Sequence, residues 1–251
     1  MNDTQPPFRY ETHLHTREAS ACARATGAEM VAAYMAAGYA GIIITDHFFN
    51  GNSSVPRTLP WAARVEQFCM GYENARAAAA GSGFRVFFGW EYNDRATEFI
   101  TLGLGKDFLL AHPDMLEWTL ETYLRRARDA GAFIIHAHPF RKRDYIPEIR
   151  LFPDLVDAVE IRNPCNGIGE DDEALDYAAQ HSLPVSAGSD RHSTEPGPIT
   201  GVGCSHRMRT LDELIAAIRA KAVTILETVP SPRFDTDDAA AQQAVPSLSE
   251  R

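Results

Sequence analysis

The chain has 251 residues, of which 45% are hydrophobic, enough for the core of one large α/β domain or of two small ones. The 24 basic and 34 acidic residues give a formal net charge of −10, which makes extended nucleic-acid binding unlikely. No apolar run reaches 18 residues, and the first residues lack the basic-then-apolar order of a signal peptide. We therefore expect a cytoplasmic protein with no membrane span.

The predicted elements alternate between strands and helices along the chain. In chain order they are a strand over 11–16, a helix over 26–39, a strand over 41–45, a helix over 61–81, strands over 84–91 and 97–105, a helix over 113–131, strands over 132–138 and 157–163, a helix over 170–182, a strand over 184–190, a helix over 210–222 and a strand over 223–227. This alternation is typical of parallel strands joined by crossover helices, and about seven such units predict a closed or nearly closed barrel.

The end of the chain differs in composition from the rest. From Pro230 onward it is poor in large apolar residues, so we expect residues 230–251 to form a flexible tail. Residues 1–229 are then expected to form a single domain.

The first predicted strand carries two histidines, His13 and His15, in the stretch ETHLHT. Side chains two residues apart on a strand point to the same face, with Cα atoms about 6.5–7 Å apart. This spacing suits two ligands of one metal ion, although His-x-His alone is also found on ordinary polar strands.

Other histidines and acids fall at or near the carboxyl ends of the later predicted strands. They are Asp46, His47, Glu91, His136, His138, Glu160, Asp190 and His192. The carboxyl ends of parallel barrel strands meet on one face, where active sites lie. Ionisable groups buried there cost free energy unless they are paired or bind metal. Imidazoles and carboxylates without a cysteine cluster favour Zn²⁺, Mn²⁺ or Fe²⁺, and there are enough of them for two or three ions.

Six short motifs occur in the order found in the PHP (polymerase and histidinol phosphatase) family, which the chain resembles over residues 12–192. They are THLHT, IIITDH, GWE, HAHPF, VEIRN and SAGSDRH. The resemblance implies a distorted (β/α)7 barrel with a trinuclear metal site at the carboxyl ends of its strands. It also implies phosphoester chemistry, because the family includes phosphomonoesterases, phosphodiesterases and exonuclease domains of DNA polymerases.

The resemblance also implies a role for each matching residue. His13, His15 and Asp190 would hold a first metal, which Glu91 would bridge to a second metal held by His138. His47 and His192 would hold a third metal. Asp46 would not bind metal itself but would orient a ligand or a water molecule by hydrogen bonding. Glu160 is a further neighbouring acid.

The chain departs from the family pattern at two ligand positions. Many relatives have a histidine on the strand after the bridging glutamate, but here that strand, TEFITLG, offers only Glu98. For the third metal, REASACA offers Glu18 or Cys22, of which we prefer Glu18. His136 is either a further ligand or lines the pocket, and strand alternation places it on the same face as His138.

The chemistry implied is hydrolysis of a small phosphorylated substrate by a hydroxide that bridges two metals. Glu91, Asp190 and His192 would be catalytic, and either of the last two would pass a proton to the leaving oxygen. Residues expected to hold the substrate are Arg17, Arg141, Arg162, Asn163 and Arg191. Three alternatives stay open: a nuclease acting on nucleotides or oligonucleotide ends, a non-catalytic metal-stabilised binding module, and an amidohydrolase, which the lack of an obvious bridging lysine disfavours.

Overall fold

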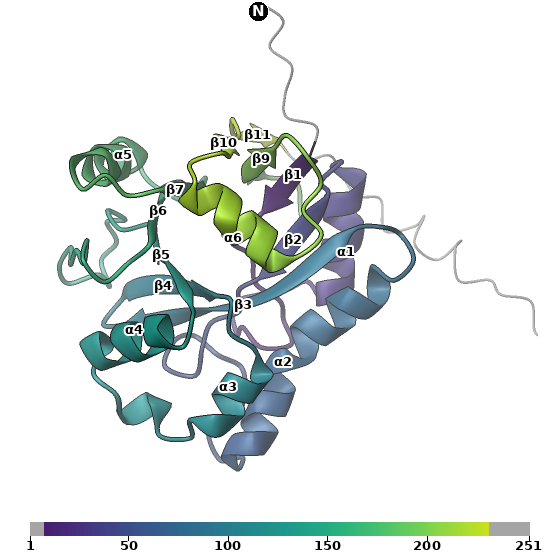
Figure 1. Ribbon diagram of the computed structural model, residues 1–251. Coiled ribbons are helices and arrows are strands. Elements are labelled where there is room, and N and C mark those ends of the chain that lie inside the picture. The colour runs from purple at the N-terminus through teal and green to yellow at the C-terminus, as the bar shows by residue number, and fades with distance from the viewer. Residues whose placement is uncertain (1–7, 231–251) are drawn as a thin grey trace, which may run out of the picture.

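The computed structural model describes residues 8–230, and Figure 1 shows how their helices surround a strongly curved sheet. The predicted tail, apart from Pro230, lies outside these residues.

The main sheet has nine strands in the order β10-β9-β1-β2-β3-β4-β5-β6-β7. Its two end strands, β7 and β10, contact each other, so the sheet is nearly closed into a barrel, as predicted. A second, two-stranded sheet pairs β8 (Pro198–Ile199) with β11 (Val229–Pro230). The strands of the main sheet are β1 (Phe8–Glu11), β2 (Gly41–Ile44), β3 (Arg85–Asp94), β4 (Thr97–Leu102), β5 (Phe133–Ala137), β6 (Ala158–Arg162), β7 (Val185–Ala187), β9 (Val202–Cys204) and β10 (Thr224–Ile225).

The sheet is mixed, whereas the alternation of elements predicted parallel strands throughout. Four neighbouring pairs are parallel, namely β1/β2, β2/β3, β5/β6 and β6/β7. Strand β4 is antiparallel to both β3 and β5. No helix separates β3 from β4, because Arg95 and Ala96, both with positive φ, turn the chain directly into a hairpin.

The helices pack around the sheet, and most of the predicted ones are present with small shifts at their ends. Their bounds are α1 (Gly27–Ala36), α2 (Trp61–Ala78), α3 (Lys106–Ala111), α4 (Leu120–Asp129), α5 (Glu170–Gln180) and α6 (Leu211–Arg219). Helix α1 begins at a capping box made by Thr26 and Glu29. The single helix predicted over 113–131 is wrong, because a short 3₁₀ turn at Met115–Glu117 precedes Thr119, which caps the start of α4.

Alternate residues of the strands face two different hydrophobic clusters. Ile43, Phe87, Ile100 and Ile135 face the barrel interior, where Leu214, Ile215 and Ile218 of α6 pack onto them. In Figure 1 this helix, drawn in yellow-green, crosses in front of the sheet. Side chains at the intervening positions pack outward against α1, α2, α4 and α5. Because α6 fills one end of the barrel, polar side chains at the strand ends can converge only at the other.

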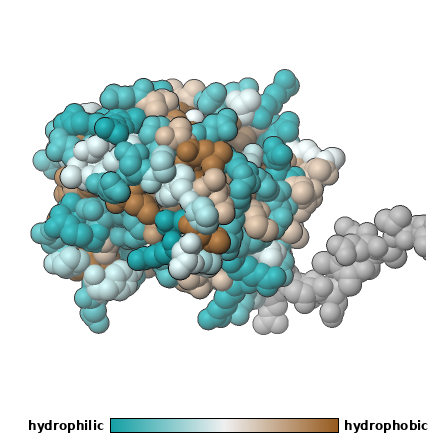
Figure 2. Space-filling view, turned by 90° about the horizontal axis from the view of Figure 1, so that it is seen from below, coloured by the Kyte–Doolittle hydropathy of each residue, from teal (hydrophilic) through white to brown (hydrophobic). Residues whose placement is uncertain are grey.

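The surface is mainly hydrophilic on the face shown in Figure 2, with hydrophobic residues gathered near its middle. Within residues 8–230, no helix is both long enough and apolar enough to cross a membrane.

Candidate metal centre

His13 and His15 lie just after β1, which ends at Glu11, so the predicted strand over 11–16 is shorter than expected. The segment nevertheless stays extended, because the backbone N–H of His15 donates to Arg191 O (2.8 Å) and that of Asp190 donates to His13 O (2.8 Å). Both imidazoles are completely buried, and their ring centroids are 5.2 Å apart. The two rings therefore lie side by side and next to Asp190.

Glu91 lies at the centre of the histidines. Its Oε1 is 3.1 Å from Nε2 of His13 and 3.2 Å from Nε2 of His138. Its Oε2 is 2.7 Å from Nδ1 of His47 and 3.6 Å from Nε2 of His15. Since each carboxylate oxygen faces a different pair of imidazoles, Glu91 is placed to bridge two ions.

Asp190 and His192 complete the side of the cluster that faces β7. Asp190 Oδ1 is 3.1 Å from Nε2 of His15 and 3.6 Å from Nε2 of His13. The His192 ring stacks on that of His15 with centroids 4.3 Å apart. Nδ1 of His192 lies 2.8 Å from Asp190 O, so Nε2 is the nitrogen that would bind an ion.

Four overlapping groups of ligand atoms result, and within each group the atoms lie within 4.8 Å of one another. The groups are His13/His15/Asp190, His13/Glu91/His138, His47/Glu91/Glu98 and His15/His47/His192. The ligands named for the first and second metals, and His47 and His192 of the third, lie in these groups, whereas Glu18 lies in none of them. Glu98, the only candidate on the strand after the bridging glutamate, also lies in one of them.

The donor atoms fit divalent metal ions. Within residues 8–230, the buried atoms without a hydrogen-bond partner include His13 Nε2, His15 Nε2, His47 Nδ1 and Glu91 Oε2. A buried polar atom without a hydrogen-bond partner costs free energy of folding, and four of them in one cluster require an explanation. Bound ions would satisfy all four, and their nitrogen and oxygen chemistry suits Zn²⁺, Mn²⁺ or Fe²⁺.

The electrostatics also favour positive charge at the centre. Burial alone would raise the pKa of Glu91, but His13 and His47 hold it well below its usual value. Burial alone would lower the pKa of His13, but Glu160, Asp190 and Glu91 raise it well above that value. In metal-free protein, protons on His13 and His47 would therefore supply positive charge that bound ions would otherwise provide, whereas burial holds the pKa of His15 well below its usual value.

His138 and His136 point in different directions, so the expectation that they share a face is wrong. Strand β5 ends at Ala137, and His138 adopts a left-handed conformation (φ 29°), which ends the alternation. His136 instead stacks on Phe99 outside the barrel, with ring centroids 4.8 Å apart. Burial holds the pKa of His136 down to about 3, so it is a neutral core residue.

A second layer of polar groups holds the ligands from behind on the His15 side. Asp46 accepts hydrogen bonds from Thr16 N (2.6 Å), Thr16 Oγ1 (2.7 Å) and Ser20 Oγ (2.7 Å). Ser20 Oγ in turn accepts from the backbone N–H of His47 (3.0 Å) and lies 3.3 Å from Nδ1 of His15. Asp46 therefore acts on the cluster through Ser20, which our sequence analysis did not identify.

Glu160 supports the ligands on the opposite side. Its Oε1 lies 3.0 Å from Nδ1 of His13, and its Oε2 accepts from the backbone N–H of His138 (3.1 Å) and from Nδ2 of Asn163 (2.9 Å). This contact directs Nε2 of His13 toward Glu91 and raises its basicity. Gly188 makes room for the arrangement, because a Cβ there would lie 2.3 Å from Cβ of His13.

Substituting Glu160→Gln is expected to weaken metal binding roughly 10- to 100-fold. The new amide would place an NH₂ where an oxygen now accepts, so at least one bond to His13, His138 or Asn163 is lost. Isothermal titration calorimetry with the metal ion measures the change in affinity. Glu173→Gln on exposed α5 is the matched control, and equal affinities of the two variants would contradict the assignment.

Comparison with solved structures identifies proteins that have a similar fold. A two-domain protein from Bacteroides vulgatus that contains a predicted PHP-like metal-dependent phosphoesterase matches with a TM-score of 0.65 and 16% identity, over 87% of this chain and 64% of that one. A candidate metal-dependent phosphoesterase from Bifidobacterium adolescentis matches with a TM-score of 0.51 and 16% identity, over 88% and 99% of the two chains. PsfC from Pseudomonas syringae matches with a TM-score of 0.51 and 15% identity, over 89% and 90%.

The fold is that of the PHP-like phosphoesterases. The chain spans 64% of the length of the two-domain Bacteroides protein. No protein-family model and no curated protein matches the sequence.

Within this PHP-like fold, Glu18 does not reach the metal cluster, so our preference for it over Cys22 is not supported by its position. Its carboxylate accepts from the backbone N–H of Gly27 (3.1 Å) and from Nδ2 of Asn74 (3.1 Å). Cys22, by contrast, contacts the side chains of His192 and His47. Burial would raise the pKa of the Cys22 thiol, but these two contacts lower it to about 6.

Among the residues expected to hold the substrate, Arg141 bonds directly to a side chain of the cluster. Arg141 is buried and donates from Nη1 to Asp190 Oδ2 (2.8 Å), while its Nη2 has no partner. Arg17 is exposed, and Arg162 has a buried Nε without a hydrogen-bond partner. The Asn163 amide is committed to Glu160 and, through Oδ1, to Cys165 N (2.9 Å).

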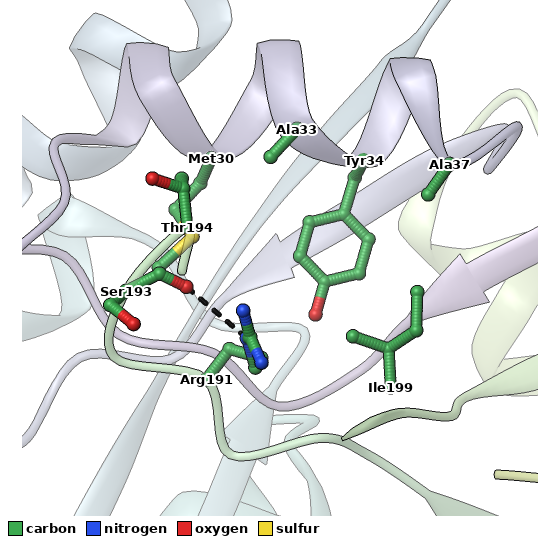
Figure 3. A pocket seen from close by; sticks show the side chains of 8 residues that line it. All are labelled: Met30, Ala33, Tyr34, Ala37, Arg191, Ser193, Thr194 and Ile199. Atoms are coloured by element: carbon green, nitrogen blue, oxygen red, sulfur yellow. Dashed lines mark hydrogen bonds between the residues drawn. The ribbon is translucent and has the colours of Figure 1, made fainter. Parts of the chain in front are cut away.

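Arg191 points away from the cluster although it lies between two of its ligands. Figure 3 shows its guanidinium in a pocket below α1, near Tyr34 and Ile199. It donates from Nε to Ser193 O (3.2 Å) and from Nη2 to Glu195 O. Arg191 therefore stabilises its own loop, and its position does not support the predicted substrate contact.

Glu11 is a buried acid behind the ligands that the sequence analysis did not include. It accepts from the backbone N–H of His13 (2.9 Å) and of Ser189 (2.9 Å), and from the Tyr34 hydroxyl (2.6 Å). These bonds join β1 to the residue before Asp190. Burial raises the pKa of Glu11 to about 7.

Proposed function

We propose that the protein is a metal-dependent hydrolase of small phosphate esters. The observation that carries this proposal is the set of four overlapping ligand groups with Glu91 at their centre. His13, His15 and Asp190 would hold one ion, and Glu91, Glu98 and His138 a second, with His47 and His192 beside them. Ions held there would acidify a water molecule and neutralise the phosphoryl oxygens.

Substrate would approach from the side of His192, His47 and Glu98. The side chains of these three residues are 29%, 11% and 16% exposed, whereas those of His13, His15 and Glu91 are at most 1% exposed. Because Nδ1 of His192 is directed at a backbone carbonyl, its outer nitrogen faces the solvent side. Because that nitrogen would bind metal, His192 would hold an ion beside the substrate and would carry no proton there for the leaving oxygen.

Arg141 would bind the phosphoryl group. It is 8% exposed, and its guanidinium bonds to Asp190 and to Asn166 Oδ1 (3.0 Å), which leaves Nη2 without a partner. A buried N–H group without an acceptor beside a metal ligand is matched by a phosphate oxygen in chemistry and in charge. The fixed guanidinium would then orient the phosphate relative to the ligands.

Replacing Arg141 by lysine is expected to reduce kcat/KM for a phosphate ester by roughly 10- to 100-fold, mainly through KM. Lysine keeps the positive charge and one donor for Asp190 but lacks the second arm of the guanidinium, and a hydrogen bond to a charged group contributes about 1.5–3 kcal/mol. Steady-state kinetics with parallel metal analysis measures the effect. Arg143→Lys is the control, since that guanidinium bonds to backbone carbonyl groups.

The function is tested by assaying the purified protein with p-nitrophenyl phosphate and its bis-ester, with added Mn²⁺, Zn²⁺ or Fe²⁺, followed by a metabolite screen for released phosphate. We expect metal-dependent turnover of at least one ester. Preference for the bis-ester or for dinucleotides would indicate phosphodiester chemistry. Bound metal with no turnover of any ester would overturn the proposal and favour a non-catalytic binding module.

A further inference from the structure

A long loop without helix or strand joins β5 to β6, over residues 138–157. Irregular connections longer than about 12–15 residues are uncommon in compact domains, and many of them bind ligands or cover active sites. The loop begins at the candidate ligand His138 and contains Arg141, the proposed phosphoryl-binding residue. It therefore starts inside the candidate metal centre, and it then reaches the surface, because residues 144–145 and 147–149 are exposed.

Ion pairs hold this loop on both sides of its exposed part. Arg141 Nη1 donates to Asp190 Oδ2 (2.8 Å), and Arg150 Nη1 donates to Asp94 Oδ2 (2.7 Å). Among the residues that the structure describes, those at 144–149 form no hydrogen bond with a segment outside the loop. The middle of the loop is thus positioned by its ends, and its own side chains are free to contact a ligand.

The middle of the loop carries large apolar side chains. Tyr145 is 69% exposed and Ile149 is 38% exposed, and Ile146 between them is half-buried. A single exposed apolar residue is ordinary on a protein surface, but apolar walls beside a few polar groups are typical of ligand pockets. We refer to Tyr145, Ile146 and Ile149 as the apolar rim.

A hollow lies between the apolar rim and the metal centre. Its walls include Glu98, His138 and Arg141 on the side of the cluster, and Ile146 and Ile149 on the side of the loop. Since Arg141 lines it, a phosphoryl group held by the unpartnered Nη2 of this guanidinium would lie beside the hollow. The group esterified to that phosphate would then have the two isoleucines as its neighbours.

The electrostatics of Tyr145 agree with a position at this edge of the site. Burial, and then the charges of Glu98 and Asp190, raise the pKa of its hydroxyl, whereas Arg141 and Arg143 lower it. Between exposed charges such influence fades beyond about 8–10 Å at ordinary salt concentrations. The Tyr145 ring, although largely exposed, therefore lies close to charged groups of the metal centre.

We infer that the apolar rim binds the organic part of the phosphate ester, and that this part is an apolar group with an aromatic ring. The inference rests on the proposed phosphoesterase function and adds a substrate class to it. A flat ring would pack on the exposed Tyr145 ring in an offset or edge-to-face arrangement, while Ile146 and Ile149 contact its edge. Binding would remove apolar surface of both the loop and the substrate from water.

Two esters that differ only in the aromatic ring test the inference, namely 2-phenylethyl phosphate and ethyl phosphate. Both release a primary alcohol when the P–O bond is cleaved, so their chemical reactivities are similar. With added Mn²⁺ or Zn²⁺, we expect the wild type to show a kcat/KM about tenfold or more higher for the phenylethyl ester, mainly through KM. Tyr145→Ala is expected to lower this ratio to near one, and Tyr145→Phe, which keeps the ring, to retain it.

The matched control is Leu175→Ala, because Leu175 is an exposed apolar residue of α5 (47% exposed). Its ratio of the two kcat/KM values is expected to equal that of the wild type. A ratio near one in the wild type, or equal ratios in the wild type and Tyr145→Ala, would overturn the inference.

Phosphonates give a second readout that does not depend on turnover, because their P–C bond is not hydrolysed. Isothermal titration calorimetry with metal-loaded protein compares 2-phenylethylphosphonate with ethylphosphonate. Tighter binding of the phenylethyl compound that is lost in Tyr145→Ala, in a protein that hydrolyses no ester, would keep the apolar rim as a binding site and reject the phosphoesterase. Ester hydrolysis with equal affinities for the two phosphonates would reject the inference alone. Neither hydrolysis nor phosphonate binding would reject both.

Discussion

Replacing Glu91 by glutamine is expected to lower phosphoester hydrolysis by roughly 10³-fold or more and to remove at least one equivalent of bound metal. Both carboxylate oxygens of Glu91 face imidazoles that belong to different ligand groups. The amide would present one weak acceptor and one donor in place of two anionic oxygens, so it cannot bridge two cations. Activity assays and elemental analysis of the same samples measure both effects.

The control for this variant is Glu121→Gln, on the exposed surface of α4, where the carboxylate pairs only with Arg125. It is expected to keep full metal content and activity. Glu91→Gln must also be shown to be folded by circular dichroism, because in metal-free protein its carboxylate is surrounded by partly charged histidines. A folded Glu91→Gln protein that retains wild-type activity would reject the bridging role.

Removing the metals is expected to lower the melting temperature by roughly 5–10 °C. An ion present at about 100 times its Kd stabilises the folded state by about 2.7 kcal/mol, and 1 kcal/mol shifts the Tm of a chain of this size by about 2–4 °C. Loss of the ions also leaves the buried carboxylates of Glu91 and Asp190 with imidazoles in place of cations as their partners. Differential scanning calorimetry with and without a chelator, followed by readdition of Mn²⁺ or Zn²⁺, gives the shift.

The matched control for chelation is the Glu91→Gln variant, whose Tm should respond much less to the chelator than that of the wild type. An identical response of the two proteins would show that stabilising metal binds elsewhere. No response in the wild type would show that the cluster holds no stabilising ion.

The barrel and most of the ligand cluster were predictable because their signals are local. The β-branched run before Asp46 and the apolar run before Glu91 identify strands β2 and β3: Asp46 lies two residues after β2, and Glu91 lies within β3. The near closure of the sheet brings the two acids into one cluster. Most of the ligand residues could be identified without knowledge of loop geometry, because each lies within a strand or a few residues after one.

The errors arose where distant contacts set the local geometry. Cys22 reaches the cluster and Glu18 does not because Ser20 is tied to Asp46 and Ala21 N donates to Asn52 O, contacts that fix the turn. His136 faces outward like Ile134, as alternation along β5 requires, and only His138 is turned toward the cluster, because its positive φ breaks the alternation. Neither effect can be found from spacing alone.

Arg191 shows a further limit of arguing from neighbours in sequence. Its position between Asp190 and His192 favoured a substrate contact, but successive side chains of an extended segment point in opposite directions. Both ligands point into the cluster, so the residue between them points out, toward α1 and the carbonyls of its own loop.

The central claim is that His13, His15, Glu91 and Asp190 surround divalent ions, and anomalous diffraction from crystals grown with Zn²⁺ or Mn²⁺ tests it most directly. The account predicts at least two anomalous peaks in contact with Glu91, one of them also ligated by His13, His15 and Asp190. Crystals that show no anomalous peak among these four side chains, or peaks only at other places on the molecule, would contradict it.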